Sequence, residues 1–126
     1  MSNYTEDHAK SGIETELPQL TVWPNQFRQY EITIQVPEFS SICPKTQLPD
    51  FGTVTLIYVP NKVCLELKSF KYYILGYRNL GIFYENAVNR VLKDVVSVCE
   101  PTSASVRGEF NFRGGMKSII KASYPS

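Results

Sequence analysis

Two stretches in the first half of the chain show the residue pattern of β-strands. In "YEITIQV", residues 30–36, every second side chain is apolar, which is typical of a strand with one buried face. "FGTVTLIYV", residues 51–59, is rich in β-branched and aromatic side chains, so it predicts a second strand. A short third strand, or an extension of the second, is expected at residues 63–65.

From Lys68 onward, apolar residues recur at the spacing of a helix rather than a strand. A first helix is predicted from there to about Gly81, and a second over residues 83–99, with Pro101 just beyond its end. The apolar stripe consists of Phe70, Tyr73, Ile74 and Tyr77 in the first helix and of Val88, Val91, Leu92, Val95 and Cys99 in the second.

Residues 105–124 predict a β-hairpin with Gly114-Gly115 as its turn. The element order β-β-α-α-β-β indicates an α+β fold, in which a four-stranded antiparallel sheet carries two antiparallel helices on one face. We expect residues 23–126 to form this single domain and the polar residues 1–22 to form a flexible leader. The uncovered face of the sheet predicts a homo-oligomer that assembles through the sheet and shares sites between subunits.

Composition narrows the functional classes. Thirteen basic and twelve acidic residues leave a net charge of +1, which argues against a dedicated nucleic-acid binder. No apolar run approaches the roughly 20 residues of a membrane span, and the N-terminus lacks the regions of a secretion signal. We therefore expect a cytoplasmic protein without a membrane partner.

The cysteine and histidine content argues against a metal site. The three cysteines include no C-x-x-C pair, and the only histidine, His8, lies in the predicted leader. A catalytic zinc bound by histidine, or a serine hydrolase that uses histidine as its base, would need that residue within the folded domain. Neither class is expected, and no metal is predicted.

Candidate chemistry lies in "EFSSICPKTQLPDF", residues 38–51. The prolines at positions 37, 44 and 49 predict an irregular, constrained loop between the first two strands. Cys43 and Asp50 lie seven positions apart in it, so a hairpin-like return would bring them to one edge of the sheet. A cysteine needs a nearby base or positive charge to act as a nucleophile at neutral pH. The structural alternative is a buried thiol and an aspartate that bonds the backbone of a turn.

Three further charged groups have two interpretations each. Lys68 and Lys71, at the start of the first helix, would bind an anion together with unpaired helix amides, or form a solvated helix face. Arg113, before the turn glycines, extends such a site or is a hairpin residue without a ligand. Glu85 interacts with the dipole of the second helix, or its carboxylate accepts the adjacent donors of a guanine-like edge.

Four blocks of the sequence resemble the short, single-domain form of the QueF family of NADPH-dependent 7-cyano-7-deazaguanine reductases, over about residues 30–115. The most specific is "ELKSFKY", residues 66–72, which matches the lysine motif of the family. The others are "FSSICPKTQLPDFGTVTLIYVP", "GIFYENAVNRVLKD" and "FRGG".

The resemblance implies the tunnelling fold (T-fold) and rings of five subunits that stack as decamers, with purine- or pterin-like ligands at subunit interfaces. It also implies a reaction. The nitrile of 7-cyano-7-deazaguanine (preQ0) is reduced by two NADPH to the primary amine of 7-aminomethyl-7-deazaguanine (preQ1), for the tRNA nucleoside queuosine.

The resemblance further assigns roles to residues. Cys43 would add to the nitrile to form a thioimide, and Asp50 would protonate its nitrogen. The implied substrate contacts are Tyr84, Glu85 and the main chain around Leu65, Glu66 and Leu67, and the implied contacts to the phosphates of NADPH are Lys68, Lys71 and Arg113. Many family members have histidine where this chain has Tyr84, and Asn86 replaces a frequent acid. A proton-shuttling role of that histidine does not carry over.

Two other functions remain open from the sequence. One is a tunnelling-fold enzyme of the cyclohydrolase or pterin-synthase type, whose zinc would need histidine ligands that the predicted domain lacks. The other is a purine-binding or assembly module without turnover, which would bind the ligand and leave NADPH unoxidised.

Overall fold

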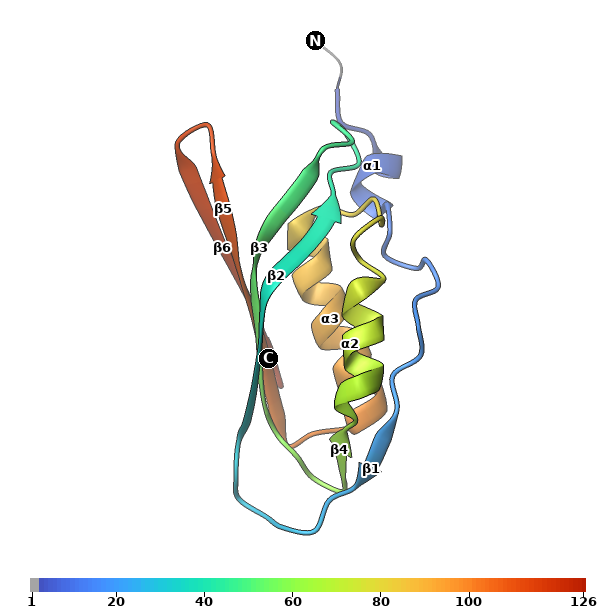
Figure 1. Ribbon diagram of the computed structural model, residues 1–126, viewed down its shortest axis with the longest axis vertical. Helices are drawn as coiled ribbons and strands as arrows, with labels where there is room; N and C mark the ends of the chain where they lie inside the picture. The colour runs from blue at the N-terminus through green and yellow to red at the C-terminus, as the bar shows by residue number, and fades with distance from the viewer. Residues whose placement is uncertain (1–2) are drawn as a thin grey trace.

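The structure is a computed structural model that describes residues 3–126. At its centre is one four-stranded antiparallel sheet, and two helices lie side by side over one face of it (Figure 1). The prediction of an α+β fold with this sheet and both helices on one face is confirmed. In spatial order the strands are β2 (Ile32–Ile42), β3 (Pro49–Val59), β5 (Ser103–Arg113) and β6 (Met116–Tyr124), and the helices are α2 (Leu67–Leu75) and α3 (Tyr84–Cys99).

The core lies between the sheet and the two helices. Helix α2 ends at Leu75, short of the predicted end near Gly81. Its stripe residues Phe70, Tyr73 and Ile74 are buried, as is Tyr77 just beyond the helix, and in the stripe of α3 only Leu92 is partly exposed. The backbone of β5 approaches α3 closely at Gly108, where an added Cβ would lie 2.6 Å from Cγ2 of Val88. At the far end of β5 the predicted hairpin turn is present, and both Gly114 and Gly115 adopt positive φ, as this tight turn requires.

Strand β2 is longer than the sequence predicts. The expectation that Pro37 ends regular pairing is wrong, because β2 continues to Ile42 and pairs with β3 as far as Pro49. The pairing register shifts between Val36 and Phe39, and a proline is tolerated at such a bulge on an edge strand. The irregular loop therefore shrinks to the residues just after Ile42.

A second, two-stranded sheet pairs β1 (Val22–Pro24) with β4 (Val63–Leu65). The predicted short strand at residues 63–65 is therefore present, but its partner comes from the boundary of the predicted leader. This small sheet lies at the end of the molecule where α2 begins (Figure 1).

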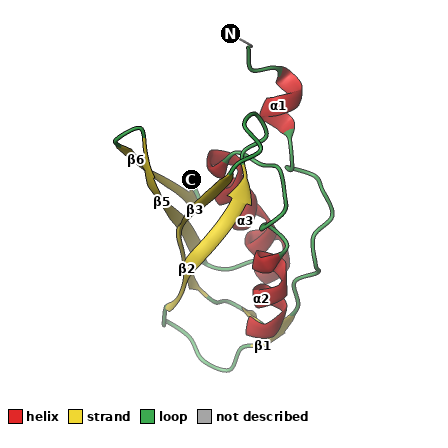
Figure 2. Ribbon diagram, turned by 45° about the horizontal axis from the view of Figure 1, so that its top comes forward, coloured by secondary structure: helices red, strands yellow, loops and turns green. Residues whose placement is uncertain are grey.

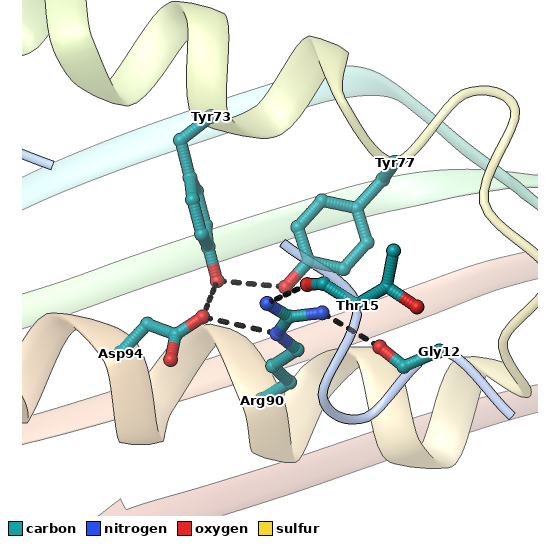
Figure 3. Close-up of polar contacts among 6 residues, drawn as sticks. All are labelled: Gly12, Thr15, Tyr73, Tyr77, Arg90 and Asp94. Carbon is teal, nitrogen blue, oxygen red and sulfur yellow. Dashed lines mark hydrogen bonds and ion pairs between the residues drawn. The ribbon is translucent and has the colours of Figure 1, made fainter. Parts of the chain in front are cut away.

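The part of the predicted leader that the structure describes is packed against the domain. It contains a short helix, α1 (Glu6–Lys10), and is held by Arg90 of α3 (Figure 3). The guanidinium donates to the carbonyl oxygens of Gly12 and Thr15 at 2.6 and 2.5 Å, and its Nε lies 3.2 Å from the carboxylate of Asp94. Regularity was not expected here, because contacts between a backbone carbonyl and a distant arginine leave no period in the sequence.

No element among residues 3–126 covers the second face of the four-stranded sheet (Figures 1 and 2). Side chains of the two central strands on that face, such as Thr55, Ile57 and Arg107, are partly or fully exposed. None of the described helices combines the length and apolarity that crossing a membrane requires.

Candidate functional site

Cys43 follows β2 directly and begins a tight loop. Its N–H donates to the carbonyl of Leu48 at 2.9 Å, and its own carbonyl accepts from the N–H of Gln47 at 2.8 Å. Gln47 adopts a positive φ of 60° within the turn. The side chain of Cys43 is only 5% exposed, so the loop holds the thiol in one place at the end of the sheet.

The surroundings of Cys43 favour the thiolate. Burial raises the pKa of the thiol and the carboxylate of Asp50 also raises it, but the hydroxyl of Thr46 and the amides of Thr46 and Lys45 lower it by hydrogen bonding to sulfur. The net result is a pKa below the ordinary cysteine value. The Thr46 hydroxyl lowers this pKa most and the two amides lower it further, so hydrogen bonds within the tight loop supply the activation that the sequence attributed to a nearby charge.

Asp50 is the second residue of β3, and its side chain is 4% exposed. Burial raises the pKa of its carboxyl, the guanidinium of Arg113 lowers it, and the nearby carboxylate of Glu85 raises it, with a net upward shift. A raised pKa keeps a larger share of the carboxyl protonated near neutral pH, as a general acid requires. The turn role considered for Asp50 is replaced by a buried position in a strand.

Arg113 lies at this same end of the sheet and is paired with Asp50, with 3.1 Å between Nη1 and Oδ1. The resemblance implied that Arg113 contacts the phosphates of NADPH. In this structure the guanidinium of Arg113 forms an ion pair with Asp50 instead. A contact between Arg113 and NADPH stays a prediction.

The start of α3 adds two predicted residues to this group. Tyr84 stacks on Phe110 with ring centroids 4.3 Å apart, and its hydroxyl donates to Ser118 at 3.1 Å. Glu85 is exposed, yet near enough for its charge to act on Asp50. Asn86 donates to the carbonyl of Ala9 at 2.8 Å, so this departure from the family pattern has a structural role in holding the N-terminal segment.

The remaining predicted residues lie at the other end of α2. Glu66 caps this helix, and its carboxylate accepts the N–H groups of Lys68 at 2.7 Å and Ser69 at 2.8 Å. These hydrogen bonds hold the pKa of Glu66 below its ordinary value. The expectation that an anion meets unpaired amides here is wrong for these two amides, because Glu66 already occupies them. The N–H of Leu65 likewise donates to the hydroxyl of Tyr58, at 2.9 Å.

One chain therefore does not bring all predicted site residues together. Leu65, Glu66 and Leu67 lie where α2 begins, and its nine residues extend roughly 13 Å at about 1.5 Å per residue, with Lys68 and Lys71 on its first turns. Figure 1 shows β4 and the loop after β2 at opposite ends of the molecule. We call the two sets of site residues the cysteine group and the lysine group. The cysteine group is Cys43, Asp50, Tyr84, Glu85 and Arg113, and the lysine group is Leu65, Glu66, Leu67, Lys68 and Lys71.

Sequence reasoning missed the contribution of the N-terminal segment to the cysteine group. A cavity of about 420 Å³ beside Cys43 is lined by Asp7 and His8 of α1. Lys45, in the loop of Cys43, donates to the carbonyl of Asn3 at 3.1 Å. The sequence predicts His8 to lie in the leader, outside the domain, and no local pattern predicts that α1 lies against the Cys43 loop (Figure 2).

Comparison with known proteins gives the context of this site. The model of the family described as QueF-like protein matches residues 49–126. A relative from Elusimicrobium minutum, named NADPH-dependent 7-cyano-7-deazaguanine reductase, is 54% identical over 96% of this chain and 92% of its own length. A relative of the same name from Chlorobaculum tepidum is 57% identical over 77% of this chain and 83% of its own.

The fold also has a counterpart among solved structures. The apo form of the archaeosine synthase QueF-Like superposes with a TM-score of 0.71 at 21% sequence identity, over 76% of this chain and 94% of that one. At that identity the likeness supports the fold alone. The family match and the close relatives carry the assignment, and they confirm the resemblance found in the sequence: this chain belongs to the QueF family of NADPH-dependent 7-cyano-7-deazaguanine reductases.

Proposed function

We propose that the chain reduces the nitrile of 7-cyano-7-deazaguanine to the primary amine of 7-aminomethyl-7-deazaguanine, in the formation of queuosine in tRNA. The observation that carries the proposal is the pair at the end of β2 and β3: a cysteine whose pKa is lowered and a buried carboxyl whose pKa is raised. A nucleophile and a proton donor with opposite shifts are what addition to a nitrile requires.

The first step uses only groups of the chain and the substrate. The thiolate of Cys43 forms a bond to the nitrile carbon, one π bond of the C≡N group breaks, and its electron pair takes the proton of Asp50. The product is a thioimide, whose carbon accepts a hydride more readily than that of a nitrile. When the carbon is later reduced, its bond to sulfur breaks and Cys43 leaves as a thiolate, poised for another cycle.

Bound NADPH would supply the hydrides for both reductions. The residues available to hold its phosphates are Lys68 and Lys71, which are exposed on the first turns of α2. Lys71 also lines a groove of about 650 Å³ between α2 and the edge strand β2, with Arg78 beside it. Two exposed ammonium groups, together with a guanidinium nearby, fit a ligand that carries several phosphates.

The substrate ring would be held by the carboxylate of Glu85 and the side chain of Tyr84, together with the main chain around Leu65, Glu66 and Leu67. Because the two ends of α2 separate these residues in one chain, the complete pocket takes its cysteine group from one copy and its lysine group from another. The uncovered sheet face supports assembly through the sheet, and a ring of five, paired as a decamer, is the proposed form. A cytoplasmic location suits an enzyme of tRNA-nucleoside synthesis.

Incubation of the assembled protein with the cyano base, without NADPH, tests the chemistry. We expect a covalent adduct on Cys43 by intact mass and its loss in Cys43→Ala. In a second incubation, with NADPH added, we expect oxidation of NADPH that depends on the base. A folded, assembled sample that shows neither adduct nor oxidation contradicts the proposal. Tight binding of the base without turnover would favour a non-catalytic binding module, and a stoichiometric zinc would favour a cyclohydrolase-type enzyme.

A further inference from the structure

The hydroxyl of Ser41 is fully buried and has no hydrogen-bond partner among the described residues. Buried polar atoms in folded proteins are almost always paired, because an unpaired one loses its bonds to water without replacement. Such an atom needs a reason, and functional sites are where unpaired groups are tolerated.

The pairing of the strands places this hydroxyl beside the proposed acid. Ser41 of β2 lies directly opposite Asp50 of β3, and side chains that are directly opposite on antiparallel strands have Cβ atoms about 5 Å apart. Phe39 and Gly52 form a pair on the same face two residues along each strand, so Ser41 faces the buried side of the sheet. Cys43 follows two residues later in the chain.

The charged groups around Asp50 stabilise its carboxylate only in part, so a neutral hydrogen-bond donor would add to its stabilisation. Arg113 of β5 contacts Oδ1 at 3.1 Å, whereas the carboxylate of Glu85 on α3 disfavours a charge on Asp50. The loop after β2 brings Cys43, whose thiolate is negative as well. When Asp50 gives up its proton, a carboxylate that is 4% exposed must be stabilised in this setting, and a buried carboxylate needs hydrogen-bond donors.

We propose that Ser41 is a positioning residue, whose hydroxyl donates a hydrogen bond to the carboxylate of Asp50 once that group has protonated the substrate. This inference rests on the proposed function of Asp50. The proton that moves to the substrate comes from Asp50, and Ser41 keeps its own. The unpaired hydroxyl of the ligand-free chain is thus a donor that is already in place for the charge that develops during the reaction.

Ser41→Ala separates this role from a structural one. A hydroxyl that already holds the fold together would destabilise the protein when removed, whereas removal of an unpaired one leaves the melting temperature unchanged or raises it. The reaction, in contrast, should be impaired. We expect adduct formation on Cys43 to slow about 10- to 100-fold in Ser41→Ala, which corresponds to the loss of one hydrogen bond to a charged group.

The pH profile of adduct formation is the more specific measurement. A donor to the carboxylate lowers the pKa of Asp50, so its loss raises that pKa. We expect the high-pH limb to move to higher pH in Ser41→Ala while the maximum falls. Ser41→Thr keeps the hydroxyl, so it retains the pH profile of the unsubstituted chain. The matched control is Ser40→Ala. Ser40 is also buried, but it lies opposite Phe51 rather than Asp50, and its side chain is on the other face of the strand.

Three results would overturn the assignment: an unchanged rate and pH profile in Ser41→Ala, a melting temperature that falls in that variant, or equal effects of Ser40→Ala. A chain that forms no adduct even without substitutions contradicts the proposed function instead. In that case an NMR titration of the Asp50 carboxyl in the unsubstituted chain and in Ser41→Ala decides the role of Ser41. If the hydroxyl donates to the carboxylate, its removal must raise the pKa of Asp50.

Discussion

The guanidinium of Arg113 lies 3.1 Å from the buried carboxyl of Asp50. Arg113 ends β5 just before the hairpin turn, and its side chain is 45% exposed, whereas that of Asp50 is 4% exposed. An exposed cation next to a buried acid stabilises the charged form of the acid. The strength of the proposed proton donor therefore depends on a residue at the tip of a hairpin.

Arg113→Ala should raise the pKa of Asp50 further, because the guanidinium lowers it. We expect the high-pH limb of adduct formation on Cys43 to move upward in the absence of NADPH. The pH profile of adduct formation checks this, since that step needs no cofactor. The KM for NADPH should remain unchanged if Arg113 acts only on Asp50, and a large increase would assign it to the phosphates as the resemblance implied.

Arg107→Ala is the control for Arg113→Ala. Arg107 also belongs to β5 and is half exposed, but its ion-pair partner is Glu109. A pH profile that shifts equally in both variants would show a general effect of positive charge rather than the contact with Asp50.

Thr46→Val should raise the pKa of Cys43, because the Thr46 hydroxyl bonds to its sulfur. Alkylation by iodoacetamide near neutral pH should then slow several-fold. At high pH the rates of Thr46→Val and the unsubstituted chain should converge, because Cys43 is a thiolate in both. The pH dependence of alkylation, followed by intact mass, measures this. Thr46→Ser keeps the hydroxyl and should behave like the unsubstituted chain.

Cys99 provides an internal reference in the same alkylation experiment. Burial raises the pKa of its thiol to about 11, so it should remain unmodified near neutral pH in the folded protein. If Thr46→Val alkylates at the rate of the unsubstituted chain throughout, the backbone amides alone activate Cys43.

Arg90→Met should release the N-terminal segment, because it removes two hydrogen bonds to backbone carbonyls and the ion pair with Asp94. Hydrogen bonds to a charged group contribute about 1.5–3 kcal/mol each, so we expect the free energy of unfolding to fall by about that amount or more. Denaturant unfolding measures the loss, and hydrogen exchange should show faster exchange in residues 6–20.

Lys93→Met is the matched control for Arg90→Met, since Lys93 is exposed on the same helix. It should leave both the unfolding free energy and the exchange of residues 6–20 unchanged. Exchange in Arg90→Met that matches the unsubstituted chain would show that other contacts, such as Asn86 with Ala9, hold the segment by themselves.

Two inactive variants should restore activity to each other if copies share sites. Cys43→Ala damages the cysteine group, and a chain with both Lys68→Ala and Lys71→Ala damages the lysine group. Mixed assembly of these chains creates some pockets in which both groups are intact, so NADPH oxidation should partly return. The measurement is the oxidation rate after the two chains are unfolded and refolded together.

The control mixture combines Cys43→Ala with Asp50→Asn. Both substitutions lie in the cysteine group, so every pocket keeps one defect and no activity should return. Equal recovery in the two mixtures, or none in either, would contradict a pocket assembled from the two groups of different copies.

Local patterns in the sequence determined most of the elements. Period-two alternation marked β2, β-branched and aromatic content marked β3, the helical stripes marked α2 and α3, and the paired glycines marked the turn between β5 and β6. These predictions succeed because each pattern reflects one face of an element against a common core. The resemblance of the motifs then identified the family and implied the roles of Cys43 and Asp50.

Only the tertiary structure decided which of those residues meet. The continuation of β2 past Pro37 depends on its place at the sheet edge, and the anchoring of the N-terminal segment depends on Arg90, far along the chain. Strand register places Ser41 opposite Asp50 and brings Arg113 close enough to form an ion pair with Asp50. Contacts between residues distant in sequence leave no local period, so the chain alone determined the elements and the folded arrangement decided the chemistry of the site.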